Sequence, residues 1–218
     1  MLRWLVDSPR RSGWPATLGP VRVAAGVVTV RPVKMRDAGE WSRLRIKNQN
    51  SLMPWEPTGQ GSWESRHQPS SWGPLFSMLK AEAKRGGVLP FVIEVDGRYA
   101  GQLTVGNVQF GAVRSAWIGY WVDADIAGGG VASAAVALGV DHCFGEVGLH
   151  RLDATVQPDN VASQAVLTKL GFRQEGLLKR YMDVNARWRD HYLYAVTAEE
   201  ITGSAVDTLI RAGRAFAP

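Results

Sequence analysis

The chain has 218 residues, of which 45% are hydrophobic and 21% charged, and its formal net charge at pH 7 is +5. This composition is typical of a soluble globular protein, and the apolar runs fall short of the roughly twenty residues of a membrane span, so we expect neither a disordered chain nor membrane association. The positive charge comes without an arginine-rich run or an aromatic-basic RNA signature, so we expect no nucleic acid partner and favour a ligand that carries phosphate groups.

Residues 1–20 are interpreted as an N-terminal extension, of open role, to a single domain that spans residues 21–218. The short apolar patch in the extension is interrupted at Asp7 and Pro9 before it reaches the length of a secretory signal core. The single cysteine, Cys143, cannot form an internal disulfide, which agrees with a reducing compartment, and we expect it to be a buried apolar residue. We therefore expect a cytoplasmic protein.

After the extension, the pattern predicts two short strands and a helix. Residues 20–32 contain alternating apolar and polar side chains, as in strands that bury one face. Asp37 is a candidate N-cap for the helix that follows. Trp41 and Leu44 recur at helical spacing and are expected in the core.

Residues 51–57, SLMPWEP, are expected to form a fixed loop, because the prolines restrict their own backbone and that of the preceding residues. Trp55 and Glu56 stand between the two prolines. Loops held by a scaffold often carry binding residues, so both are candidates for substrate binding. The alternatives are that Glu56 takes up a proton during catalysis, or that both residues are structural.

The middle of the chain predicts a helical region followed by three antiparallel strands. Residues 62–86 are expected to form helix interrupted at Pro69 and Pro74. The Asp96-Gly97 pair is a strong hairpin signal. The strands are expected at 91–97, 99–105 and 112–122.

Three consecutive glycines, Gly128, Gly129 and Gly130, follow the third of these strands and precede an alanine-rich helix over 131–144. Glycine has no Cβ and adopts positive φ readily, so main-chain N–H groups can approach a ligand closely. The helix would direct its unpaired N–H groups and its positive dipole end at the same turn, which makes an anion-binding site. P-loop and Rossmann spacings are not met, since no Gly-Lys-Ser/Thr follows and Ser133 occupies the last glycine position. Taken on their own, the three glycines have an alternative interpretation, a flexible turn that joins the strand to the helix.

The remainder of the chain predicts a strand, a helix, a hairpin and a terminal helix. Residues 150–172 contain a strand, a turn at Pro158-Asp159-Asn160 and a helix that ends near Gly171. Two strands at 173–184 and 188–197 and a helix at 198–216 complete the expected elements.

Together, the glycine turn and the segment NVASQAVLTKLGF resemble the GCN5-related N-acetyltransferase (GNAT) superfamily. In that family a Gln/Arg-x-x-Gly-x-Gly/Ala turn binds the pyrophosphate of acetyl-coenzyme A, and Gly128 and Gly130 match its two small positions. Asp125 stands where the family prefers Gln or Arg. The LMPWEP loop and the segment LLKRYMDVNARWRDHYLYA resemble the RimJ/RimL type of ribosomal-protein N-terminal acetyltransferases, and the WRDH residues within that segment are closer to the RimJ branch.

The resemblance implies an α+β, three-layer GNAT fold with a mixed, mostly antiparallel sheet of about seven strands flanked by helices. Beyond Trp121 the strand is expected to part from its neighbour, and acetyl-coenzyme A would lie in that gap as a cosubstrate, without a metal. A main-chain N–H near Val122 would hold the oxyanion of the tetrahedral intermediate. The cofactor-binding residues implied by the resemblance are Tyr120, Trp121, Val122, Ile126, Ala127, Gly128, Gly129, Gly130, Val131, Ala132, Asn160 and Ser163.

The resemblance also implies that Ser163 protonates the leaving thiolate, with a serine that bonds its own helix backbone as the alternative. Tyr181 is a second candidate for this acid, or else a packed strand residue. The general base is left open, because Met182 stands where the RimL branch has a suspected glutamate. A terminal α-amine has a pKa of about 8, against about 10.4 for lysine, so a weak base or water alone could suffice. His191 beside Asp190 suggests either a proton relay or a structural histidine.

We therefore expect an acetyl-coenzyme A-dependent N-acetyltransferase that transfers acetyl directly to a protein N-terminal α-amine, the acceptor being a ribosomal protein. Two alternatives stay open. One is a non-catalytic acyl-coenzyme A-binding regulatory module, and the other is an acetyltransferase for small amines such as antibiotics or polyamines. The chain is compatible with a monomer or a homodimer.

Overall fold

The computed structural model describes residues 13–216. Residues 1–12, most of the expected N-terminal extension, lie outside the described part. The indole Nε1 of Trp14 donates a hydrogen bond to the Pro90 carbonyl (3.0 Å), and the first strand already begins at Leu18. The described portion of the extension therefore packs on the domain.

Within the described residues, one eight-stranded sheet runs through the domain in the order β1-β2-β3-β4-β5-β6-β8-β7. Neighbouring strands are antiparallel except β5 and β6, which are parallel. The sheet is mixed and mostly antiparallel, as expected, but it has eight strands rather than about seven, because both strands of the first hairpin join it. The strands are β1 (Leu18–Val23), β2 (Gly26–Pro32), β3 (Val88–Val95), β4 (Arg98–Gln109), β5 (Ser115–Val122), β6 (Arg151–Val156), β7 (Arg173–Val184) and β8 (Arg187–Thr197).

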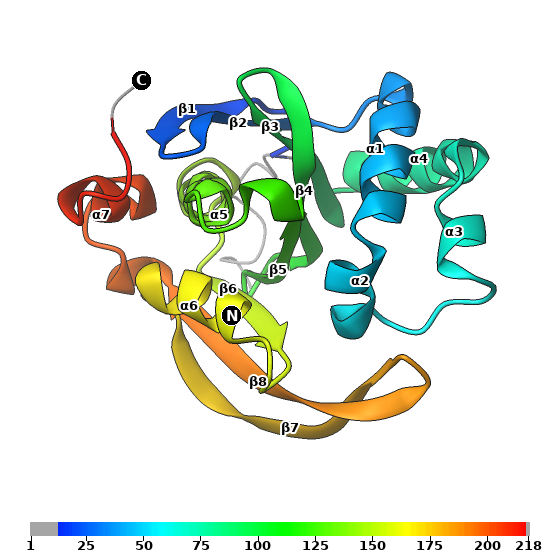
Figure 1. Cartoon of the computed structure of the whole chain (residues 1–218). Helices are drawn as coiled ribbons and strands as arrows, with labels where there is room; N and C mark the ends of the chain where they lie inside the picture. The colour runs from blue at the N-terminus through cyan, green and yellow to red at the C-terminus, as the bar shows by residue number, and fades with distance from the viewer. Residues whose placement is uncertain (1–12, 217–218) are drawn as a thin grey trace.

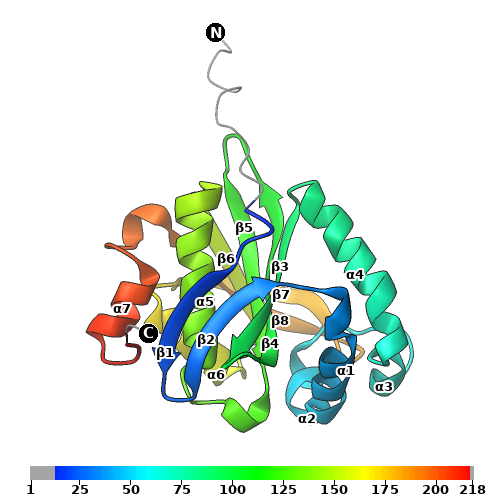
Figure 2. The same ribbon diagram turned by 90° about the horizontal axis from the view of Figure 1, so that it is seen from above.

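Helices cover both faces of the sheet, which gives three layers (Figures 1 and 2). Helix α5 packs against one face with α6 and α7 beside it, whereas α1 and α4 pack against the other. Among residues 13–216, no helix is both long and apolar enough to cross a membrane. The helices are α1 (Ala38–Lys47), α2 (Gln49–Leu52), α3 (Trp63–Arg66), α4 (Pro69–Lys84), α5 (Val131–His142), α6 (Val161–Lys169) and α7 (Ala205–Arg211), with a π-helical turn at Cys143–Val147.

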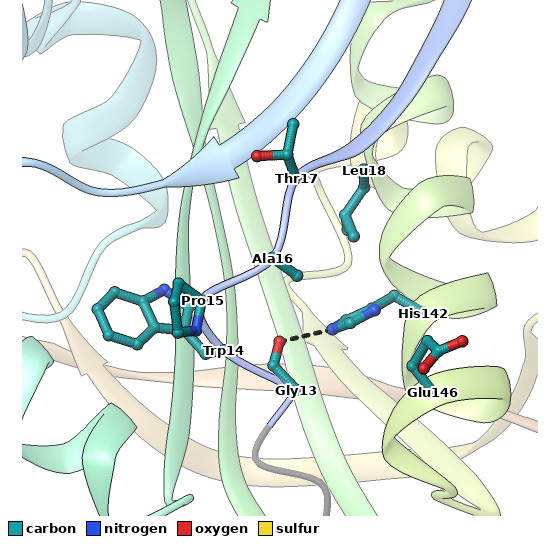
Figure 3. A pocket seen from close by; sticks show the side chains of 8 residues that line it. All are labelled: Gly13, Trp14, Pro15, Ala16, Thr17, Leu18, His142 and Glu146. Carbon is teal, nitrogen blue, oxygen red and sulfur yellow. Dashed lines mark hydrogen bonds between the residues drawn. The ribbon is translucent and has the colours of Figure 1, made fainter.

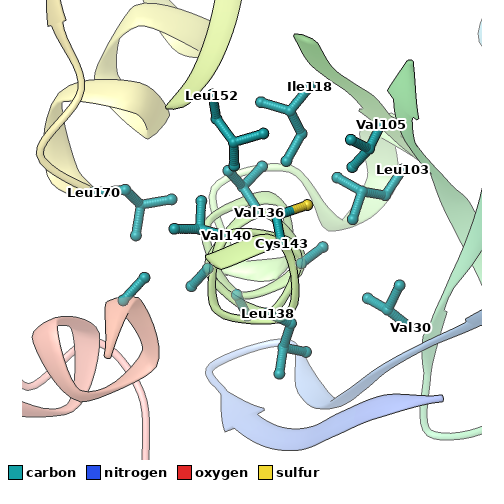
Figure 4. Close-up of a cluster of buried hydrophobic side chains, with 14 of the residues drawn as sticks. Val30, Leu103, Val105, Ile118, Val136, Leu138, Val140, Cys143, Leu152 and Leu170 are labelled. Atoms are coloured by element: carbon teal, nitrogen blue, oxygen red, sulfur yellow. The ribbon is translucent and has the colours of Figure 1, made fainter. Parts of the chain in front are cut away.

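The larger core lies between α5 and the sheet (Figure 4). Nearly every residue of α5 is buried, because β1 and β2, the centre of the sheet, α6 and α7 surround it. This explains why the helix is apolar around its whole circumference. Cys143 is fully buried at the end of this helix, and burial raises the pKa of its thiol to about 12. The expectation of a buried apolar cysteine is confirmed.

A smaller core lies between the opposite face of the sheet and helices α1 and α4. Trp41, Leu44 and Trp72 from the helices pack there with Val92 of β3 and Tyr99 of β4. Trp41 and Leu44 are buried, as their helical spacing predicts. This second core fixes α1, whose C-terminal half supplies residues to the site described below.

Helix α4 continues through Pro74, where the sequence pattern predicts a break. Pro69 is its first residue, where a missing N–H removes no intrahelical bond. Pro74 removes the bond to the carbonyl of Ser70, but Ser70 is exposed, so water can bind that oxygen. The predicted interruption at Pro69 is confirmed, because α3 ends at Arg66 and α4 begins at Pro69, whereas the predicted interruption at Pro74 is wrong.

Two other boundaries differ from the predictions. The expected helix at 198–216 is reduced to α7, because Gly203 adopts φ +79° and Ser204 then caps a new helix by accepting from the N–H of Asp207. The loop at 51–57 is partly helical, since α2 ends within it and a 3-10 turn follows at Met53–Trp55. Proline at the start of that turn is compatible with its backbone.

Gly139 allows α5 to approach the sheet closely. A Cβ at this position would lie 2.8 Å from Leu103 Cδ2 and 3.2 Å from Ile118 Cδ1. We expect Gly139→Val to lower the free energy of unfolding by about 1–3 kcal/mol, because the added methyl groups overpack this core. Urea denaturation followed by circular dichroism measures the change.

Gly39 in α1 supplies the matched control, since a Cβ there meets nothing within 4 Å. Gly39→Val is expected to leave stability within about 0.5 kcal/mol of the parent protein. Equal destabilisation by the two variants would contradict the assignment of Gly139 to a packing role.

Candidate active site

Strands β5 and β6 separate after a short paired stretch. Residues 115–117 pair with 151–153, and no pairing between the two strands continues beyond Trp117. β5 stays paired with β4 up to Val122, and β6 stays paired with β8 up to Val156, so the two halves of the sheet diverge. The expected parting of the strands is present, but it begins after Trp117 rather than beyond Trp121.

A cavity of about 190 Å³ lies in this gap. Its walls come from β5, β6, β8, the start of α6 and the loop after α2. The side chains that matter for the chemistry below are Trp55, Tyr120, Gln157, Asn160, Ser163 and His191. The fold thus brings Trp55, Tyr120, Asn160 and Ser163, all expected site residues, to one cavity.

The main chain of β5 offers hydrogen-bonding groups to this gap. The N–H of Asp123 donates to the Ala100 carbonyl of the β4 side (2.8 Å), so the main-chain groups of Asp123 and Trp121 face β4. Because successive residues of a strand alternate in direction, the N–H and C=O of Tyr120 and Val122 face the gap. An extended ligand can therefore pair with β5 there as an additional strand.

The glycine turn lies between the end of β5 and α5. Gly128 and Gly130 adopt φ values of +80° and +88°, which L-residues with a side chain rarely adopt. Within residues 13–216, the main-chain N–H groups of Gly128, Gly130, Val131 and Ala132 have no hydrogen-bond acceptor. With the positive end of the α5 dipole, these N–H groups are suited to bind an anion, which is the role that the sequence predicts for this turn.

Gly129, the middle glycine, serves a different purpose. Its carbonyl accepts a hydrogen bond from the Ala25 N–H (3.1 Å), and a Cβ at Gly129 would lie 2.6 Å from the Ala25 side chain. Gly129 therefore lets the β1–β2 hairpin dock on the turn.

Asp125 is compensated by a neighbouring cation. Lys47 Nζ, at the end of α1, contacts Asp125 Oδ2 (2.5 Å) and Asp123 Oδ1 (2.9 Å). Asn48 adds two hydrogen bonds, donating to Asp123 Oδ1 (3.0 Å) and accepting from the Ala124 N–H (2.9 Å). α1 thereby anchors the segment before the glycine turn, and the paired charge explains how an acidic residue is accommodated beside an anion site.

Ser163 and Tyr120 meet across the cavity. Asn160 caps α6 by accepting from the Ser163 N–H (3.1 Å), which sets the position of the serine. The hydroxyls of Tyr120 and Ser163 are 2.9 Å apart. Burial raises the pKa of Tyr120 to about 12, against a smaller lowering by the Ser163 bond. Both hydroxyls are therefore neutral at physiological pH and form a linked pair.

Glu56 is engaged by Arg45, the main contact that sequence reasoning missed. Both carboxylate oxygens accept from the Arg45 guanidinium, which is itself nearly buried and lies over the rings of Trp63 (4.8 Å) and Trp121 (5.2 Å). Arg45 also contacts His67 Nε2 (3.0 Å). Arg45 and Glu56 are 11 residues apart in the sequence, and no local sequence pattern predicts that they pair.

His67 is a neutral partner in this cluster. Burial and the neighbouring Arg45 lower the pKa of His67 to about 4. Its Nδ1 is 2.7 Å from the Trp63 carbonyl and donates to it, so Nε2 accepts from Arg45. A second guanidinium, that of Arg66, lies over the Trp63 ring (5.4 Å), and both oxygens of Glu56 are engaged by Arg45.

Tyr181 lies apart from the linked pair. Its side chain is 47% exposed on β7, and its ring contacts the His191 ring with centroids 5.6 Å apart. It does not line the cavity. Tyr181 therefore contacts the ring of His191 and lies outside the cavity that Ser163 lines.

A clasp joins the loop at 56–58 to the tip of the β7–β8 hairpin (Figure 1). The Thr58 N–H donates to the Asp183 carbonyl (2.8 Å), and the Thr58 hydroxyl donates to the Asp183 carboxylate (2.9 Å) and accepts from the Ala186 N–H (2.8 Å). Gln157 ties the same loop to β6 by donating to the Pro54 carbonyl (3.0 Å).

A second cavity, of about 510 Å³, lies between residues 13–18 and the end of α5 (Figure 3). His142 Nε2 donates there to the Gly13 carbonyl (2.6 Å). The cavity adjoins the point where the described chain begins and shares no residue with the gap between β5 and β6. It contributes nothing to the site described here.

Comparisons with known proteins place this geometry in context. A family profile described as "Acetyltransferase (GNAT) domain" matches residues 28–173. The ribosomal protein uS5-alanine N-acetyltransferase of Escherichia coli strain K12 is 29% identical over 192 residues, which cover 87% of this chain and 97% of that protein. The structure of Mycobacterium smegmatis RimJ in complex with CoA-disulfide is 58% identical, with a TM-score of 0.94 and coverage of 94% of this chain and 99% of that one. The ribosomal-protein-S5-alanine acetyltransferase from Vibrio fischeri is 28% identical, with a TM-score of 0.73 and coverage of 80% and 96%.

The raised pKa of Tyr120 predicts a contribution to alkaline instability. A folded-state pKa of about 12, against 10.0 for an unperturbed tyrosine, means that the folded protein keeps a proton that the unfolded chain loses. The contribution of Tyr120 to the free energy of unfolding is complete below pH 10 and is lost as the pH rises through about 12. The loss amounts to at most about 2–3 kcal/mol. We expect Tyr120→Phe to lose less stability than the parent protein between pH 10 and 11.5 in urea titrations. Parallel pH curves for the two proteins would contradict this.

Proposed function

Because the chain belongs to the GNAT family of N-acetyltransferases, we propose that it transfers the acetyl group of acetyl-coenzyme A to the N-terminal α-amine of a ribosomal protein. The observation that carries this proposal is the gap between β5 and β6, which joins an anion site at one end to a cavity with paired hydroxyls. The choice of acceptor is supported by the relatives, since both the Escherichia coli protein and the Vibrio fischeri structure are described as alanine acetyltransferases of the same ribosomal protein.

The residues present fit the coenzyme. The free N–H groups at Gly128, Gly130, Val131 and Ala132 suit the pyrophosphate, and the outward main chain of Tyr120 and Val122 suits the amide-containing pantetheine arm. These residues, with Trp121, Ile126, Ala127, Gly129, Asn160 and Ser163, are the proposed coenzyme site. The Mycobacterium smegmatis relative was solved with a disulfide of coenzyme A, which supports this assignment.

The chemistry follows from groups that line the gap. Acetyl-coenzyme A supplies the thioester, and the N–H of Val122 is the proposed donor to the oxyanion that forms when the amine attacks. The linked hydroxyls of Ser163 and Tyr120 are the proposed source of the proton for the departing thiolate. Ser163 contacts Tyr120 with its side chain, so this pair replaces the other candidate, Tyr181, which lies outside the cavity.

The acceptor would enter on the side of Trp55, Gln157 and His191. Glu56 is proposed to shape this side through its pair with Arg45 rather than to act as the base. An α-amine suits a site with weak proton acceptors, since making it neutral near pH 7 costs about 1–1.5 kcal/mol, against about 4–5 kcal/mol for a lysine amine.

The acceptor class can be tested by mass spectrometry of reactions with acetyl-coenzyme A. We expect one acetyl group on the α-amine of a peptide that begins with the alanine of ribosomal protein uS5. The control is the same peptide with a blocked N-terminus and a free lysine, which is expected to react at least about 100-fold more slowly because of the higher lysine pKa.

Polyamines and aminoglycosides in the same panel test the small-amine alternative. Reaction of these amines without reaction of the peptide would overturn the ribosomal acceptor and keep the acetyltransferase. Coenzyme binding without any acetylation would instead favour the regulatory module.

The coenzyme site can be tested at Gly128. A Cβ there meets no protein atom within 4 Å, so it would project into the space proposed for the pyrophosphate. We expect Gly128→Ala to raise the dissociation constant of coenzyme A by at least about 10-fold in calorimetry, which corresponds to about 1.4 kcal/mol.

Gly111, in the β4–β5 loop, provides a control with the same backbone strain. It has φ +90° and equally open surroundings. Gly111→Ala is expected to cost similar stability, about 1–2 kcal/mol, and to leave coenzyme affinity unchanged. Equal coenzyme affinities for the two variants would argue against an anion site at the glycine turn.

A further inference from the structure

We propose that His191 is the group that accepts the proton of the incoming amine, directly or through one water. This inference rests on the proposed function, because it assigns the base that the acetyl transfer leaves open. His191 belongs to β8, the strand beside β6, and its imidazole lines the cavity in the gap together with Trp55, Tyr120 and Ser163.

The orientation of the ring leaves one nitrogen available. His191 Nδ1 is 3.1 Å from the Arg189 carbonyl, which can only accept, so Nδ1 carries the hydrogen. Nε2 then holds a lone pair, and no polar atom within residues 13–216 forms a hydrogen bond with it. The Tyr181 ring packs against the edge of the imidazole and supports this orientation. The tautomer is the one that a proton acceptor requires.

The surroundings keep the imidazole neutral. His191 is only 3% exposed, and burial lowers its pKa, against smaller raising effects of the Arg189 bond and of Asp190. Asp190 is tied to the neighbouring strand β7, where its carboxylate accepts from the Arg180 N–H (2.7 Å). The titratable groups facing from the other elements are phenols, Tyr181 on β7 and Tyr120 on β5, and no cation from residues 13–216 lines the cavity.

The other candidate proton acceptors are occupied or unsuitable. Both oxygens of Glu56 accept from Arg45. Tyr120, with a pKa of about 12, cannot act as a base near neutral pH. Met182 has no titratable group and pairs with Arg189 on the neighbouring strand. His191 is thus the cavity residue with an accessible lone pair of suitable basicity.

The proton balance of the reaction assigns a destination to each atom. The ammonium group of the acceptor gives one proton to His191 Nε2 and becomes a neutral amine. Its nitrogen attacks the thioester carbonyl, so that a C–N bond forms and the C–S bond breaks. The departing thiolate takes a proton from the Ser163–Tyr120 pair, and the second proton of the nitrogen replaces it there through water, giving the amide and coenzyme A thiol. His191 then releases its proton to water.

The test compares the pH dependence of kcat/KM for the parent protein and His191→Gln between pH 6 and 9.5. At pH 7 the kcat/KM of the variant is expected to be lower by about 10²–10³-fold, because a positioned base usually contributes that much to the rate. The loss should shrink above pH 8, where the α-amine, with a pKa of about 8, is already neutral. The KM for acetyl-coenzyme A should stay within a factor of about three, since the proposed coenzyme contacts are elsewhere.

His150→Gln is the matched control, because His150 is exposed and bonded to Glu199 away from the cavity. It should keep the parent rate at every pH. A loss in His191→Gln that is the same at all pH values, or no loss, would overturn the proposal. Thermal unfolding of both variants identifies a folding defect.

A second measurement needs no turnover and separates this inference from the choice of acceptor. Nitrogen NMR of the coenzyme A-bound full chain, with imidazole-labelled histidine, should show His191 neutral at pH 7 with hydrogen on Nδ1. An imidazolium at pH 7, or hydrogen on Nε2, would overturn the role of His191 whichever amine is acetylated. If only a non-ribosomal amine reacts, the pH comparison is made with that amine. The test of His191 therefore does not depend on the identity of the acceptor.

Discussion

The hydrogen bonding between β5 and β6 stops after three residue pairs, and the rest of the site depends on that interruption. Unpaired main-chain groups inside a protein are costly, so a strand with one open edge needs another partner or water. Here β5 remains tied to β4 and β6 to β8, which hold the open edges apart as parts of two rigid half-sheets. The cavity is therefore set by the sheet itself rather than by mobile side chains.

Helix α1 links the two ends of the site. At its C-terminal end, Lys47 and Asn48 hold the segment that precedes the glycine turn, while Arg45, one turn earlier, holds Glu56 and the loop of Trp55. Arg45 is nearly buried, and the cost of removing its charge from water is offset by the carboxylate, by His67 and by two indole rings. Because the second core fixes α1 on the sheet, changes in that core would displace the segment before the glycine turn and the loop of Trp55 together.

The sequence was informative where function depends on the main chain or on local contacts. The glycine turn with its positive φ values and the GNAT family were predicted and are confirmed, because each is encoded within a few neighbouring residues. The Arg45–Glu56 pair and the contact between Tyr120 and Ser163 could not be predicted, since each joins residues that meet only after folding. Pro74 shows that a strong local signal can also mislead. The helix continues through this proline because the freed carbonyl of Ser70 is exposed to water and because packing holds the helix in place. For His191, the pattern offered two interpretations, and its place on the cavity wall favours the catalytic one.

The clasp at Thr58 bears on when such an enzyme can act. Three hydrogen bonds join the loop that follows Trp55 to the hairpin tip, so this part of the chain is closed on itself. If the acceptor enters beside Trp55, as proposed above, it has to present a free and extended N-terminus. A ribosomal protein would then be a substrate only before its first residues are buried in the assembled particle.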